Sequence, residues 1–213
     1  MQITRLKMEQ FRSYTSVDIP FKEGITVLYG ANAQGKTNLL EGVFLCCAGK
    51  SHRASSDKEM IRYNQPFARV QADILRKDGP HQIQIVLPQQ KMKSVRFDGA
   101  PVRRLSSFVG QLHCVLFSPE NIRMVREGPA LRRQFMDLAL CQVYPSYVSS
   151  LLDYNRALKQ RNALLKTGDR IALETLPIWD EQLNQSGTMI MNMRRAFISE
   201  VAFYSKIAQF STD

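Results

Sequence analysis

The apolar residues of the first 120 positions follow two patterns, and both are typical of β-strands. In residues 3–11 and 68–87 apolar and polar positions alternate, which predicts strands with one buried face. Asp78-Gly79 interrupts the second segment and predicts the tight turn of a hairpin. Uninterrupted apolar runs at 25–29 and 114–117 predict two further strands, each covered on both faces. Short runs at 16–21 and 94–97 predict partner strands.

A helical period replaces the alternation in two parts of the chain. Apolar residues recur at helical spacing between Leu39 and Cys47, and Gly49 predicts the end of that helix. From Pro119 onward the whole chain has a helical pattern, and prolines precede or open its segments. Gly168 is expected to end one of these helices and Gly187 to bend or interrupt the last one. We therefore expect an α/β lobe at 1–120, with a β subdomain at about 60–112, and a helical lobe at 121–213 that is incomplete at its C-terminus.

The positive charge of the chain is unevenly distributed. The formal net charge is +10, and residues 61–110 carry nine basic but only three acidic side chains. Such a concentration attracts a phosphate backbone, although a solvated basic face without a partner explains it about as well. The candidate contacts with nucleic acid are Lys91, Lys93, Arg96, Arg103 and Arg104.

Several classes of protein are disfavoured. No apolar run reaches the length of a membrane span, and the first residues lack the organisation of a signal peptide, so we expect a cytoplasmic protein. The four cysteines include no C-x-x-C pair and the three histidines have no ligand spacing. We therefore expect inert thiols and no metal site built by the protein alone.

The segment between the predicted strand at 25–29 and the following helix matches the phosphate-loop pattern G-x-x-x-x-G-K-[ST]. Glycines at both ends let successive N–H groups point inward, and the helix N-terminus favours an anion. Lys36 would add a charge for the β- and γ-phosphates, and Thr37 a hydroxyl for Mg²⁺. Asn32, at the crest, could meet the terminal phosphate or could simply tolerate a left-handed turn. The candidate contacts are Gly30, Ala31, Asn32, Ala33, Gln34, Gly35, Lys36, Thr37 and Asn38.

Further motifs surround this loop. FRSY precedes it at 11–14, GKSHR follows its helix, and FSPENIRMVREGPALRRQFMD occupies 117–137. Together with GANAQGKTN, these segments resemble the RecF family of bacterial DNA recombination-mediator ATPases over nearly the whole chain. The resemblance implies an ABC-type ATPase head with a helical second lobe, ATP with Mg²⁺ as cofactors, and action on gapped DNA. It also implies RecR and RecO as partners and an ATP-dependent homodimer of the intact protein.

The resemblance adds three candidate contacts outside the loop. The Phe-Arg-Ser segment of the family lies near the nucleotide, which makes Arg12 and Ser13 candidates for phosphate or adenine. From the residues alone, Arg12 is an exposed charge at a strand end. Related heads approach adenine about 25 residues after the loop, which here falls on Tyr63. An aromatic residue at a strand edge is more often a packing residue.

Two elements of ABC-type catalysis are not found in this sequence. An apolar strand ending in two acidic residues and an LSxGQ-like signature are both missing before Asp213. In the RecF family both follow the helical lobe, so we expect this chain to be an N-terminal part that binds ATP without turning it over. The alternatives are a stand-alone P-loop kinase for a small molecule, which would turn over ATP, and a binding module whose loop holds no nucleotide.

Overall fold

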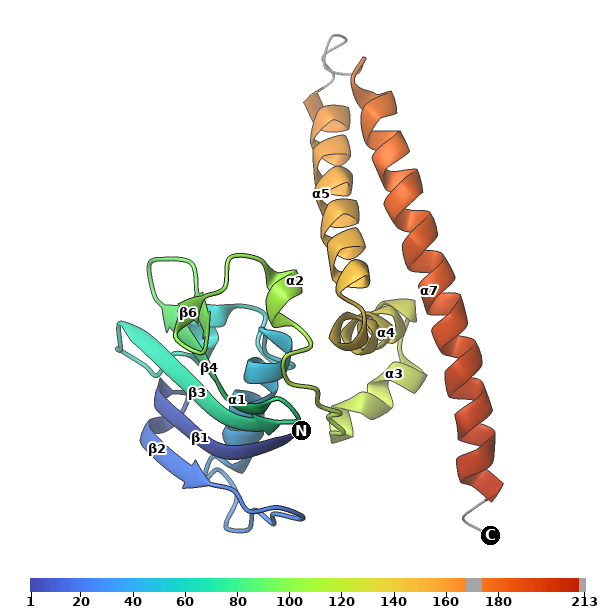
Figure 1. Cartoon of the computed structure of the whole chain (residues 1–213). Coiled ribbons are helices and arrows are strands. Elements are labelled where there is room, and N and C mark those ends of the chain that lie inside the picture. Colours follow the sequence, from blue (N-terminus) through green and yellow to red (C-terminus); the bar gives the residue numbers. More distant parts are fainter. Residues whose placement is uncertain (168–173, 211–213) are drawn as a thin grey trace. The chain divides into compact units, whose positions relative to one another are not determined.

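The computed structural model describes residues 1–167 and 174–210, and the chain divides into two compact units, 1–117 and 118–213. The strands of the first unit form one sheet in the order β2-β1-β3-β4-β5-β6, and each pair of neighbours is antiparallel (Figure 1). Their bounds are β1 (Gln2–Phe11), β2 (Tyr14–Pro20), β3 (Phe67–Arg76), β4 (Gly79–Pro88), β5 (Ser94–Phe97) and β6 (Ala100–Pro101). The predicted hairpin and both predicted partner strands are confirmed.

One face of the sheet is apolar, as the alternation predicts. Met8 on β1 lies opposite Val70 on β3, which lies opposite Ile85 on β4, and all three side chains are buried. Helix α1 (Lys36–Ala48) packs on this sheet, and its residue Gly42 makes a close approach. A Cβ at Gly42 would stand 2.4 Å from the sulfur of the buried Met8, so a larger residue at this position would require the Met8 side chain to move.

The two predicted strands at 25–29 and 114–117 are wrong. Neither run belongs to a strand, and the side chains of Ile25 and Tyr29 are 95% and 92% exposed. Val115 is 99% exposed in the second run. An apolar run records a tendency to be buried, but burial needs a neighbouring strand and a covering layer, and no described residues supply them here.

Helices make up most of the second unit within the described residues. They are η2 (Pro119–Ile122), α3 (Arg123–Arg126), α4 (Pro129–Val143), α5 (Pro145–Thr167) and α7 (Leu176–Phe210), while the short η1 (Asp57–Met60) and α2 (Leu105–Phe108) belong to the first unit. The predicted helix starts at Pro129 and Pro145 are confirmed. Helices α5 and α7 run side by side (Figure 1). The predicted stop at Gly168 lies outside the described residues.

The prediction that Gly187 interrupts the last helix is wrong, because α7 continues through it. A Cβ at Gly187 would stand 3.3 Å from the ring of Tyr154 on α5, so the glycine serves a close helix contact. Nearby, Arg194 on α7 donates to Asp137 on α4 at 2.7 Å and to the hydroxyl of Tyr147 on α5 at 3.0 Å. These bonds join the three long helices of this unit.

Candidate phosphate-binding site

The loop at 30–37 has left-handed angles at both glycines, as its sequence predicts, but its third left-handed residue is Ala33 and not Asn32. Gly30, Ala33 and Gly35 have φ values of 144°, 65° and 91°, which lie in the region open mainly to glycine. Gly35 caps α1 without a side-chain hydrogen bond, so the first N–H groups of the helix keep their capacity for an anion. The Lys36 ammonium curls back and donates to the carbonyl oxygens of Gly30 and Ala31, both at 2.7 Å.

The turn between β1 and β2 is packed against this loop. Asn38, in the first turn of α1, donates from its amide nitrogen to the Ser13 hydroxyl at 3.0 Å. A Cβ placed on Gly35 would meet the ring and hydroxyl of Tyr14 at 2.9 Å and the Ser13 hydroxyl at 3.1 Å. The structure therefore brings Ser13, a candidate contact, directly beside the last glycine of the loop.

Arg12 lies in the same turn, but its side chain points to a carboxylate of α1. Its guanidinium donates to both oxygens of Glu41, at 2.9 and 2.7 Å, and to the carbonyl of Glu59 at 2.6 Å. The backbone is strained here, because Gln10 and Arg12 have φ values of 51° and 52°. Backbone hydrogen bonds hold this conformation, from the N–H of Arg12 to Met60 and from the N–H of Arg62 to Gln10, both at 2.8 Å.

Sequence reasoning missed Glu41, which is fully buried on α1. Burial raises the pKa of its carboxyl, but the hydrogen bonds from Arg12 and Ser51 and the charges of Arg12 and Arg53 outweigh that effect and lower the pKa below its ordinary value. The signal was present in the sequence. Glu41 stands three residues before Phe44 and four before Leu45, which places it on the same face of the helix as these apolar residues.

Tyr63 is fully displayed on the surface, with 88% of its side chain exposed. It follows Ile61, which bridges to Phe11 at the end of β1, so the segment is anchored beside the β1–β2 turn. This position leaves the ring accessible for stacking. Its role as an adenine contact stays a prediction.

The five basic residues predicted to contact nucleic acid differ in their surroundings. Lys91, Arg96, Arg103 and Arg104 are exposed, on β5 and in the loops beside β5 and β6, and no ion pair joins them to other described residues. Lys93 instead donates to the carbonyl of Gly49 at 2.7 Å and pairs with Asp57 at 3.0 Å. The Lys93 ammonium therefore caps the C-terminal end of α1.

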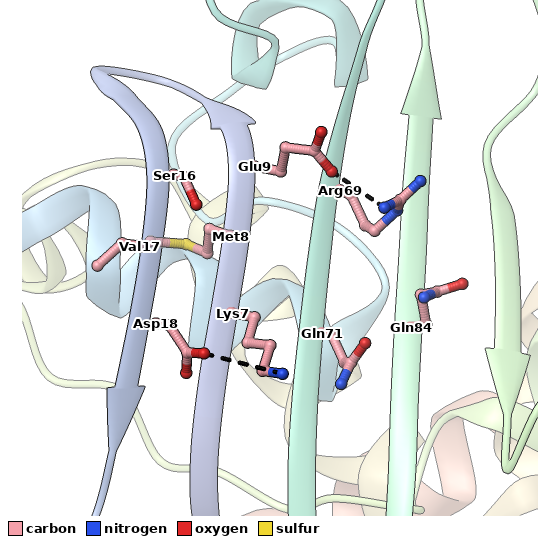
Figure 2. Close-up of a pocket in the computed structure, with 9 residues that line it drawn as sticks. All are labelled: Lys7, Met8, Glu9, Ser16, Val17, Asp18, Arg69, Gln71 and Gln84. Carbon is pink, nitrogen blue, oxygen red and sulfur yellow. Dashed lines mark hydrogen bonds and ion pairs between the residues drawn. The ribbon is translucent and has the colours of Figure 1, made fainter.

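A separate shallow pocket lies on the polar face of the sheet (Figure 2). Its charged groups are already paired, Arg69 with Glu9 at 3.0 Å and Lys7 with Asp18 at 3.8 Å. No residue of the 30–37 loop lines it. The pocket consequently adds nothing to the phosphate site.

Residues 1–167 and 174–210 contain neither a metal site held by the protein alone nor a membrane-spanning helix. No three His, Cys, Asp or Glu side chains there are grouped in a way that could hold a metal ion. The helices in these ranges are too short or too polar to cross a bilayer. Thr37, exposed in the first turn of α1, remains the predicted protein ligand for a Mg²⁺ that arrives with nucleotide.

The chain is similar in sequence to one domain family and to several curated proteins. The AAA domain family matches residues 5–187. A DNA replication and repair protein RecF of Lachnoclostridium phytofermentans is 39% identical over 203 residues, which are 94% of this chain and 56% of that protein. The RecF of Shouchella clausii is 40% identical over 204 residues, 94% of this chain and 55% of its own length. The chain thus spans about half the length of the curated relatives it matches.

Solved structures agree with these relatives. The recombination mediator protein RecF-ATP of the RecFOR pathway superposes with a TM-score of 0.86 at 29% identity, over 92% of this chain and 54% of that one. An SMC ATPase structure at 21% identity, with a TM-score of 0.53, shares the fold alone. The predicted fold class, a P-loop ATPase head followed by helices, is confirmed. The chain belongs to the AAA domain family, and its similarity to RecF proteins extends over 94% of its length.

Proposed function

We propose that the chain binds ATP together with Mg²⁺ through the loop at 30–37 and the first turn of α1. The observation that carries this proposal is the loop itself, whose left-handed residues wrap the Lys36 ammonium at an uncapped helix N-terminus. Support comes from the RecF-ATP structure, on which this chain superposes closely.

Each residue has a defined task in this proposal. The main-chain N–H groups of the loop receive the phosphate oxygens, and Lys36 exchanges the carbonyls of Gly30 and Ala31 for the β- and γ-phosphates. Thr37 offers its hydroxyl to Mg²⁺, whose charge offsets that of the phosphates. Asn32 faces the terminal phosphate from the crest of the loop. Ser13 and Tyr63 border the nucleoside end.

Thermal unfolding with and without ATP and Mg²⁺ tests the proposal. A ligand that binds only the folded state at 100 times its Kd stabilises it by about 2.7 kcal/mol, which raises the Tm by several degrees. Lys36→Ala should fold normally and lose this response. A wild-type Tm that does not move over a full titration, or a Lys36→Ala response equal to that of the wild type, would refute nucleotide binding by the loop.

We further propose that Lys91, Arg96, Arg103 and Arg104, here termed the basic surface, contact the phosphate backbone of DNA. Their exposure and the lack of ion pairs to described residues leave these charges available. Binding would be independent of the DNA sequence, because no helix among the described residues resembles a recognition helix. Lys93 is not included, since its ammonium serves α1.

The wider role follows from the relatives. Their name, DNA replication and repair protein RecF, supports a role for this chain in DNA repair, and our proposal extends this role to recombinational repair in the cytoplasm. RecR, RecO and an ATP-bound homodimer are the proposed partners. We expect the chain by itself to show no steady-state ATP turnover, because it carries no signature segment and no paired acids at a strand end. Turnover that depends on a small-molecule acceptor would favour a kinase instead.

A further inference from the structure

Helix α1 carries a buried carboxylate whose hydrogen-bonding capacity is filled by two arginines and a serine. Glu41 is 0% exposed. One of its oxygens accepts from Arg12 at 2.7 Å and from the Ser51 hydroxyl at 2.5 Å. The other accepts from Arg12 at 2.9 Å and from Arg53 at 3.2 Å. A buried ion pair seldom stabilises a fold more than apolar side chains of the same shape. The buried charge of Glu41 therefore indicates a role in positioning its partners.

Polar contacts connect this carboxylate with the phosphate loop. The same Arg53 nitrogen that donates to Glu41 also donates to the side-chain oxygen of Asn38, again at 3.2 Å. Asn38 in turn donates to Ser13, whose hydroxyl lies 3.1 Å from the Cβ position of Gly35. A displacement of Arg53 would therefore change the contacts of Asn38 in the first turn of α1, where the phosphates are proposed to bind.

The two arginines are held with unequal strength. Arg12 is 19% exposed and bound in bidentate fashion, and it also donates to Glu59. Arg53 is 31% exposed and is held by two longer contacts. One carboxylate faces two guanidinium groups, so a positive charge is left over beside the loop. Arg53 is the group with the freedom to offer that charge to an anion.

We propose that Glu41 is a positioning residue that holds Arg53 beside the first turn of α1, where the Arg53 guanidinium contacts the phosphates of the bound nucleotide. This role rests on the proposed binding of ATP. It assigns a third cationic element to the site, besides Lys36 and Mg²⁺. In this proposal Arg12 neutralises the negative charge of Glu41. The positive charge of Arg53 therefore stays available to the phosphates.

A double-mutant cycle on ATP affinity tests the role, with the Kd for ATP and Mg²⁺ measured by titration calorimetry. The four proteins are the wild type, Glu41→Gln, Arg53→Ala and the double variant. Loss of one charge-assisted hydrogen bond weakens binding on the order of tenfold, and we expect that loss from each single variant. The double variant should bind no more weakly than Arg53→Ala, because Glu41 acts through Arg53. Losses that multiply in the double variant would overturn the positioning role.

A matched control separates positioning from general stability. Asp137→Asn removes another arginine-paired carboxylate, in the helical unit, and should lower the Tm without changing the Kd for ATP. If Glu41→Gln binds ATP as the wild type does, the role of Glu41 is wrong while ATP binding stands. If the wild type itself does not bind ATP, the proposed function falls and this role with it.

Variants of Arg53 test the proposal independently if Glu41→Gln does not fold. Arg53→Ala should still weaken ATP binding, and Arg53→Lys, which keeps the charge but not the planar fork, should recover part of the affinity. Unchanged affinity in Arg53→Ala would overturn the proposal by itself. Weaker binding of ATP should be accompanied by a smaller salt dependence of the Kd, which a purely structural defect would not produce.

Discussion

Lys93 donates a hydrogen bond from its ammonium to the carbonyl oxygen of Gly49, 2.7 Å away, although 44 residues separate the two in the chain. Gly49 is the left-handed C-cap of α1, so a cation from the loop before β5 meets the negative end of the helix that begins at the phosphate loop. Residues of the helix itself provide no basic side chain in its last turn.

The first prediction concerns stability. Lys93→Ala leaves the Gly49 carbonyl and part of the Asp57 charge without their partner, and we expect a loss of about 1–3 kcal/mol in the free energy of unfolding. Lys91→Ala, an exposed neighbour, should change it by less than about 0.5 kcal/mol. Urea unfolding of both variants measures the difference. Equal losses would contradict the capping role of Lys93.

The second prediction concerns DNA. Replacing Lys91 and Arg96 together by alanine should weaken binding of a DNA duplex and reduce the slope of log K against log salt by about two, one for each lost phosphate contact. Fluorescence anisotropy over a series of salt concentrations measures the slope. Lys159→Ala, an exposed lysine of the helical unit, should leave it unchanged. A slope that is the same in all three proteins would mean that the basic surface is only a solvated face.

The third prediction separates backbone strain from ligand binding. Gly35 and Gly99 have φ values of 91° and 77°, so alanine at either position costs about 1–2 kcal/mol of stability. At Gly35 the new Cβ also meets Tyr14 at 2.9 Å, whereas at Gly99 it meets nothing within 4 Å. We expect both variants to have a lower Tm, but only Gly35→Ala to lose the rise in Tm caused by ATP. An ATP response in Gly35→Ala equal to that in Gly99→Ala would speak against the loop.

The fourth prediction concerns pH. The hydrogen bond that the His81 ring donates to Asp98 raises the pKa of His81; burial opposes this rise, and the charges of Asp98 and Asp78 add to it. A folded-state pKa above the ordinary value of 6.5 means that His81 stabilises the fold fully below pH 6.5 and loses this effect as the pH rises through the folded pKa. The Tm should therefore fall over that range in the wild type.

A pair of histidine variants checks this assignment. His81→Gln should remove the fall in Tm above pH 6.5, because its side chain has no proton to lose in that range. His113→Gln, at an exposed position, should retain it. A fall that persists in His81→Gln would place the titrating group elsewhere.

Local pattern was sufficient for much of the fold. The alternation in β3 and β4 and the turn at Asp78-Gly79 specify a hairpin by themselves, since each apolar residue has its partner within 21 positions. The glycines of the phosphate loop could also be predicted, because the left-handed backbone angles that require them depend on the local sequence. Ser13, in contrast, came from family resemblance, and its contact with Asn38 depends on tertiary packing.

The errors arose where the outcome depends on distant residues. The run at 25–29 has the composition of a buried strand, but composition cannot provide the strand that would pair with it. Gly187 was interpreted from its helix propensity alone, whereas the ring of Tyr154 on a different helix decides its role. The capping by Lys93 and the pairing of Glu41 with Arg53 were missed for the same reason.

The exposed run at 25–29 has a practical consequence for handling the isolated chain. Ile25, Val27 and Tyr29 are β-forming residues with 73% or more of each side chain in water, and neither a proline nor a charge interrupts them. Such a segment can recruit its counterpart in another molecule edge to edge. The chain should therefore form aggregates at high concentration, and a charged substitution at Val27 should raise its solubility without touching the phosphate loop that begins three residues later.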